Sequence, residues 1–100
     1  MSEYHLLIDD IRTYNVDQIA RTAKDGLEAL RTKEVTHLYL DNDLGSKTEG
    51  WHILETALEE NICPPYIHIV SSNTSAKARM KLALEASGYH TVNGVIFLRS

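Results

Sequence analysis

Short apolar runs alternate along this chain with longer segments in which apolar residues recur at a helical period. The apolar runs lie at residues 6–8, 38–40, 64–72 and 94–100, and each is bounded by polar or turn-forming residues. Short, bounded apolar runs are typical of strands that are buried on both faces of a sheet. We therefore predict strands at these positions and a further candidate strand at residues 17–23, which read DQIARTA.

Three helices are predicted between these strands, because apolar residues there recur every three or four positions. Thr22 and Asp25 have the spacing of a capping pair at the start of the first helix. Residues 73–75 can cap the third helix, and Gly88 can end it. The predicted apolar faces are Ala23, Leu27 and Leu30 in the first helix, Trp51, Leu54 and Leu58 in the second, and Ala76, Met80, Ala83 and Leu84 in the third.

Strands that alternate with helices predict a compact α/β fold with a mainly parallel sheet of four to five strands and flanking helices. Residues 1–100 are predicted to form a single domain, because no linker, repeat or low-complexity tract interrupts the alternation. Only IRTYNV, six residues, separates Asp10 from the candidate second strand, and such a segment spans about 20 Å when extended. That length excludes a helical crossover, so the orientation of the second strand is left open.

The end of the chain allows two arrangements. Asn93 and Gly94 stand between β-rich runs, which is typical of a two-residue hairpin turn. If they form a hairpin, the last strand has an antiparallel neighbour, and Arg99 is directed away from any site at the carboxyl ends of the other strands. If the last strand is parallel to the others, Arg99 lies at those ends. The sequence leaves both arrangements open.

The composition excludes several classes of protein. Fourteen acidic against ten basic residues give a formal net charge of −4, and no basic block stands out, so a duplex DNA partner is not expected. Cys63 is the only cysteine, which excludes an internal disulfide. No apolar run approaches the roughly 18 residues of a membrane span, and the first residues lack the features of a signal peptide. We expect a cytoplasmic protein that contacts no membrane.

Two pairs of acidic residues follow two of the predicted strands. Asp9 and Asp10 come after the first strand, and Asp41 and Asp43 come after the run at residues 38–40. In open parallel sheets the ligand site lies outside the carboxyl ends of the strands, so these carboxylates are expected to converge. Clustered carboxylates repel one another unless a cation offsets their charge, and oxygen ligands suit Mg²⁺ or Mn²⁺. The alternative is that each pair only forms a turn or a helix cap.

The order of these segments resembles the receiver domain of two-component response regulators. In that family an acidic pair after the first strand binds Mg²⁺, and an aspartate after the third strand accepts a phosphoryl group. A Ser or Thr after the fourth strand contacts the phosphate, and a lysine follows the fifth. The resemblance assigns these positions to Asp9, Asp10, Asp41, Ser71 or Ser72, and Arg99 in place of the lysine. The helices that usually follow the first and fifth strands of a receiver are missing, which implies a trimmed, flavodoxin-like or receiver-like fold.

The chain is still more similar to a small receiver-like family of bacteria and phages that is predicted to process cyclic phosphates. The segments IDDIR, RTAKDGLEAL, LDNDLG, TEGW, CPPYIHIVSSN and ARM follow one another in the order of that family's motifs and cover nearly the whole chain. Two histidines of the family are replaced here by Asn42 and Ser71. Asparagine does not exchange a proton near neutral pH, so catalysis is expected to be weak unless His52 replaces the lost groups.

Three functions therefore compete. The first is metal-dependent binding, with weak processing, of a phosphate-bearing ligand such as the cyclic phosphate of an RNA end or a nucleotide. The second is a phosphoacceptor receiver in which Asp41 is the nucleophile. The third is a non-catalytic module that binds a protein partner. The predicted site residues are Asp41 and His52 for catalysis, Arg12, Ser71, Ser72, Asn73 and Arg99 for phosphate binding, and Asp9, Asp10, Asp41 and Asp43 for the metal, with Asp43 expected to order the loop or to act as an outer-shell ligand.

Overall fold

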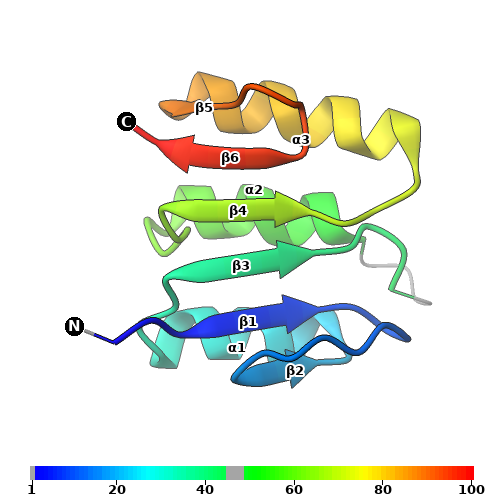
Figure 1. Cartoon of the computed structure of the whole chain (residues 1–100), viewed down its shortest axis with the longest axis vertical. Helices are drawn as coiled ribbons and strands as arrows, with labels where there is room; N and C mark the ends of the chain where they lie inside the picture. Colours follow the sequence, from blue (N-terminus) through cyan, green and yellow to red (C-terminus); the bar gives the residue numbers. More distant parts are fainter. Residues whose placement is uncertain (1, 45–48) are drawn as a thin grey trace.

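The computed structural model describes residues 2–44 and 49–100, and within them the chain forms six strands and three helices (Figure 1). The elements are β1 (His5–Ile8), β2 (Gln18–Ala20), α1 (Ala23–Thr32), β3 (His37–Leu40), α2 (Gly50–Glu59), β4 (Tyr66–Ile69), α3 (Thr74–Ala86), β5 (Tyr89–His90) and β6 (Ile96–Arg99).

A single mixed sheet organises the fold, with the strand order β2-β1-β3-β4-β6-β5. The four strands β2, β1, β3 and β4 are parallel, whereas β6 is antiparallel to both β4 and β5. The predicted mainly parallel α/β fold is confirmed. The sheet has one strand more than the four to five expected, because the two-residue strand β5 is too short to stand out as an apolar run.

The second strand, whose orientation the sequence left open, is short and parallel to β1. No helix occurs in residues 9–17, which connect the two strands. An extended segment spans about 3.3 Å per residue, so residues 9–17 are long enough to run back along the four-residue strand β1 and begin β2 beside it. The segment crosses one face of the sheet, where the ring of Tyr14 meets that of Tyr39 edge-on with 6.1 Å between the ring centres.

Strands β5 and β6 form a hairpin, but its loop is longer than a two-residue turn. Residues 91–95 connect the strands, and Gly94 adopts a φ of 77°, which favours glycine. The side-chain oxygen of Thr91 accepts hydrogen bonds from the backbone N–H groups of Asn93 and Gly94, and the side-chain oxygen of Asn93 accepts from those of Val95 and Ile96. These bonds hold the loop, and the arrangement with an antiparallel last strand is the one adopted.

The reversed direction of β6 corrects the expectation for Arg99. Its backbone N–H donates to Pro65, and its guanidinium donates to the backbone carbonyl of Cys63 over 3.1 Å. Both partners precede β4, so Arg99 lies at the edge of the sheet where the parallel strands begin. It therefore lies outside a phosphate site at the other edge.

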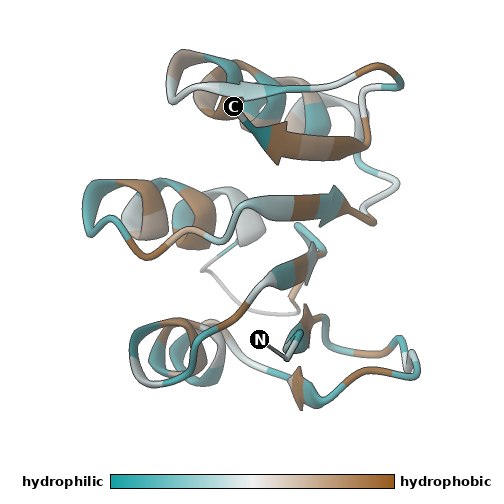
Figure 2. Cartoon of the chain, turned by 60° about the vertical axis from the view of Figure 1, so that its left-hand side comes forward, coloured by the Kyte–Doolittle hydropathy of each residue, from teal (hydrophilic) through white to brown (hydrophobic). Residues whose placement is uncertain are grey.

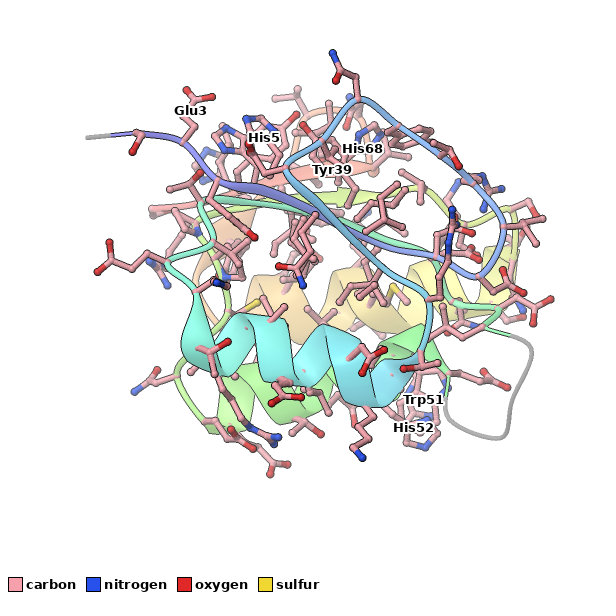
Figure 3. The ribbon with its side chains drawn as sticks, turned by 90° about the horizontal axis from the view of Figure 1, so that it is seen from below. Glu3, His5, Tyr39, Trp51, His52 and His68 are labelled. Atoms are coloured by element: carbon pink, nitrogen blue, oxygen red, sulfur yellow. The ribbon has the colours of Figure 1, made fainter. Side chains whose placement is uncertain are left out.

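All three helices cover one face of the sheet (Figures 1 and 3). Fully buried side chains from alternate strand positions form the core between the sheet and the helices. Figure 2 shows β6 as a mainly apolar strand, whereas the helices carry both apolar and polar bands. The main core residues are Leu6, Ile8, Leu38, Leu40, Ile53, Leu54, Ile67, Met80, Leu84 and Phe97. None of the helices in the described parts of the chain is long and apolar enough to cross a membrane.

Candidate functional site

Three carboxylates converge at the edge where the parallel strands end. Asp9 follows β1 and Asp41 follows β3, and backbone hydrogen bonds from Asp9 to Ala20 and from Asp41 to Ile8 continue the sheet to these positions. Asp9, Asp10 and Asp41 each place a carboxylate oxygen within 4.8 Å of the other two. Asp9 is fully buried and Asp41 is only 4% exposed. The register of two adjacent parallel strands thus brings together residues that are about thirty positions apart in the sequence.

The fourth predicted ligand, Asp43, is exposed and does not belong to this group. It stands three residues beyond the end of β3, where the chain has left the sheet. The loop that Asp43 was expected to order includes residues 45–48, which lie outside the described residues. The structure therefore brings three of the four predicted metal ligands together.

Arg12 reaches back into the acidic group. Its guanidinium lies 2.9 Å from a carboxylate oxygen of Asp9 and 3.4 Å from one of Asp41. The other oxygen of Asp9 accepts hydrogen bonds from the backbone N–H groups of Ile11 and Arg12, each 3.0 Å long. These contacts fold the chain tightly after β1, and they leave the Arg12 side chain about one third exposed at the rim of the site.

The two buried carboxylates differ in their proton affinity. Burial raises the pKa of Asp41, and the neighbouring charge of Asp9 raises it further. Burial also tends to raise the pKa of Asp9, but the hydrogen bonds from Arg12 and Ile11 outweigh it and hold that pKa below its ordinary value. With all three acids ionised, three negative charges against the single charge of Arg12 leave a formal charge of −2. A hard divalent cation with oxygen ligands fits this donor set and this charge.

Asn42 and Gly50 dock the start of α2 against the end of β3. The fully buried Asn42 accepts a hydrogen bond from the backbone N–H of Trp51 over 3.2 Å and donates one to the carboxylate of Glu49 over 3.1 Å. The N–H of Gly50 donates to the backbone carbonyl of Asn42 over 2.8 Å. Both ends of the Asn42 amide are therefore engaged in holding the start of α2.

His52 has a local role at the start of α2. Its Nδ1 accepts the backbone N–H of Glu49 over 3.3 Å, and its ring stacks on Trp51 with 3.6 Å between the ring centres. Figure 3 shows the two rings together on the helical side of the molecule. His52 is exposed and is not one of the groups that converge at the acidic edge. The structure therefore gives the predicted catalytic histidine a capping role.

The residues after β4 stand at the same edge as the acids, because β4 is parallel to β3 and adjacent to it. Ser71 is buried, and its hydroxyl accepts the backbone N–H of Asn73 over 3.0 Å. The side chain of Asn73 caps α3 by accepting the N–H of Ala76 over 3.0 Å. Ser72 is exposed. The Asn73 oxygen is thus committed to the helix, whereas the Ser71 hydroxyl donates its proton to no acceptor within residues 2–44 and 49–100.

A groove of about 480 Å³ opens beside this edge, between α2 and α3. Glu49, Trp51 and Asn73 line its end near the start of the two helices. The guanidinium of Arg79 lies 3.5 Å from the centre of the Trp51 ring, so one face of that ring is covered. Sequence reasoning missed Glu49 and Arg79, although they belong to the motifs TEGW and ARM.

Arg21 is a further residue that the sequence reasoning missed. Its guanidinium donates to the backbone carbonyl of Arg12 over 2.6 Å, to that of Asp9 over 3.3 Å and to the hydroxyl of Thr13 over 3.1 Å. It thereby holds the segment that positions Arg12. The signal for it was the RTA sequence at the start of the quoted RTAKDGLEAL motif.

Comparison with known protein families gives one match. A family model described as the cyclic-phosphate processing receiver domain matches residues 4–86, which run from β1 to the end of α3 and include Asp9, Asp10, Asp41 and Ser71. Comparisons with curated proteins and with solved structures give no match.

Proposed function

Because the chain belongs to the family of cyclic-phosphate processing receiver domains, we propose that its acidic edge binds Mg²⁺ or Mn²⁺ and, next to it, the cyclic phosphate of an RNA end or a nucleotide. The observation that carries this proposal is the convergence of Asp9, Asp10 and Asp41 within 4.8 Å at the ends of two parallel strands. A bound divalent cation supplies the positive charge that attracts and polarises a phosphate group.

The chain's own residues add donors for the same phosphate. Arg12 is partly exposed beside the acids and presents a planar set of N–H donors, which matches phosphate oxygens. Ser71 offers its hydroxyl proton. The first turn of α3 starts next to Ser71, and the N–H groups at a helix start favour an anion. In this proposal Arg12 and Ser71 orient the phosphate, whereas Asp9, Asp10 and Asp41 hold the cation.

Turnover is expected to be slow. General acid-base catalysis needs a group that exchanges a proton near the working pH, and histidine is the usual one. The family's histidines are replaced by Asn42, whose amide is engaged on both sides, and by Ser71. His52 uses its Nδ1 to cap α2. We therefore propose that the protein keeps the groups that bind a phosphate ligand but lacks the groups that would process it rapidly.

The test offers 2′,3′-cyclic nucleotides and RNA with a cyclic-phosphate end, together with Mg²⁺ or Mn²⁺. We expect cation-dependent binding in the wild type and a loss of at least about tenfold in affinity for Asp41→Asn, because that variant removes a charged ligand. Turnover is expected to be slow and little changed in the control variant His52→Ala. Rapid turnover contradicts the proposal, whether or not it depends on His52. An absence of both binding and turnover favours the protein-interaction module instead.

A further inference from the structure

A second group of potential ligands lies at the opposite edge of the sheet, on the face that the helices leave uncovered. His5 begins β1 and His37 begins β3, and the two are direct partners in the register of these parallel strands. Their rings stack with 4.0 Å between the ring centres and 10° between the ring planes. Glu3 stands just before β1, and Figure 3 shows Glu3, His5 and Tyr39 together above the strands, on the side away from the helices.

The donor atoms of this group are close enough to share an ion. Glu3, His5 and His37 each offer one donor atom, and the three atoms lie within 4.8 Å of one another. The carboxylate of Glu3 lies 2.9 Å from Nε2 of His5. In a tetrahedral site with zinc–ligand distances of about 2.0–2.1 Å, two ligand atoms are about 3.3 Å apart. The oxygen of Glu3 and Nε2 of His5 therefore need only a small displacement to bind the same ion.

The neighbours of both histidines fit metal ligation. The Thr36 oxygen lies 2.8 Å from Nδ1 of His37 and 3.2 Å from the carbonyl oxygen of Tyr4. When Thr36 donates its proton to Tyr4, Nδ1–H of His37 donates to Thr36, and the lone pair of His37 is on Nε2. His5 has the Tyr39 hydroxyl 2.9 Å from its Nδ1. When Nε2 of His5 binds a metal, the imidazole proton moves to Nδ1, where the Tyr39 oxygen accepts it.

From this geometry we propose that Glu3, His5 and His37 bind a divalent transition-metal ion, with Zn²⁺ as the preferred metal. Two imidazoles and one carboxylate are zinc ligands, whereas Mg²⁺ prefers oxygen alone, so this site differs in chemistry from the acidic edge. Three protein ligands leave the fourth tetrahedral position open.

Binding requires one change in the stacked pair. An imidazole lone pair lies in the plane of its ring, so two nearly parallel rings cannot both direct their lone pairs at one ion. We expect His37 to turn out of the stack, because its ring has one hydrogen-bond partner in the described residues, whereas the ring of His5 has two. The ring signals of His5 and His37 in NMR spectra should therefore both move when Zn²⁺ is added.

The experiment titrates Zn²⁺ into the untagged full chain by calorimetry, in the presence of excess Mg²⁺ to occupy the acidic edge. We expect one zinc site in the wild type. The variants Glu3→Gln and His37→Ala should each weaken it at least about tenfold, in line with the loss of one metal ligand. Glu3 is exposed, so Glu3→Gln tests the site without disturbing the sheet. The matched control is His90→Ala, which changes an exposed histidine of β5 whose ring forms a hydrogen bond with Ser100.

The variant Asp41→Asn separates this inference from the proposed function, because it should lose the acidic site and keep the zinc site. Co²⁺ in place of zinc should give the visible absorption bands of tetrahedral coordination in the wild type and not in His37→Ala. The inference is overturned if Zn²⁺ does not bind in excess Mg²⁺. It is also overturned if its affinity is the same in the wild type, Glu3→Gln and His37→Ala.

Discussion

The variant Gly50→Ala is expected to lose about 3 kcal/mol of unfolding free energy, the upper part of the usual range for overpacking. A Cβ atom at this position would overlap the carbonyl oxygen of Asp41 and lie 2.8 Å from Cα of Asn42. Both atoms belong to the backbone at the end of β3, so no side-chain rotation relieves the overlap. The start of α2 must instead move away from Asp41, and urea unfolding measures the loss.

The matched control for this prediction is Gly26→Ala in α1. There a Cβ would lie 2.6 Å from Cδ1 of Ile8, which is the far end of a flexible side chain. Alanine also favours a helix interior over glycine by about 1 kcal/mol, which offsets part of the overlap. We therefore expect a smaller change than at Gly50. Equal losses in the two variants, or none at Gly50, contradict the close docking of α2 on the acidic edge.

The variant Arg12→Met is expected to lose about 2–3 kcal/mol of unfolding free energy and to become strongly dependent on Mg²⁺. Removing Arg12 leaves the buried carboxylates of Asp9 and Asp41 without their positive partner. Breaking a buried ion pair costs about 3–5 kcal/mol, and the partial exposure of Arg12 reduces that value. A divalent cation at the same carboxylates replaces the lost charge, so excess Mg²⁺ should recover much of the stability.

Thermal unfolding with Mg²⁺ and with a chelator measures both effects. The control is Arg31→Met, which removes an exposed arginine paired with Glu60 at 2.7 Å. Arg31→Met should unfold at nearly the same temperature as the wild type, because an exposed ion pair adds little stability. Mg²⁺ should shift the unfolding temperatures of Arg31→Met and of the wild type by the same amount. If Mg²⁺ shifts the unfolding temperatures of Arg12→Met and Arg31→Met equally, the carboxylates beside Arg12 do not hold the cation.

The acidic edge was predictable because its position follows from two local features. The runs before Asp9 and Asp41 are apolar and end abruptly, and parallel strands place such ends side by side. The sequence signal is local, whereas the convergence follows from the general geometry of the sheet. Ser71, which the resemblance to receiver domains assigned to the site, lies at the same edge because it follows the adjacent parallel strand β4.

The direction of β6 was not predictable to the same degree. An apolar strand of four residues has the same pattern in either direction, so only the Asn93-Gly94 turn indicated an antiparallel arrangement. The error in placing Arg99 follows directly from this ambiguity. The two-residue strand β5, which pairs with β6, carried too short a pattern to be recognised.

Contacts between residues on separate elements were also beyond the sequence. Asn42 was interpreted as a lost proton carrier, and nothing in its neighbourhood in the chain indicated that its amide holds the start of α2. Likewise, His5 and His37 had no shared pattern, because their pairing depends on the register between β1 and β3. Sequence patterns predict the elements, whereas register and close docking depend on tertiary packing.

The most direct test of the central claim, a cation and phosphate site at the acidic edge, is NMR spectroscopy of the isotope-labelled protein with traces of Mn²⁺. This paramagnetic ion broadens the signals of nearby amides. We predict selective broadening at residues 9–12 and 41–43, stronger binding of Mn²⁺ when a 2′,3′-cyclic nucleotide is present, and loss of both effects in Asp41→Asn. Broadening that is absent, centred elsewhere or unchanged in Asp41→Asn would contradict the account.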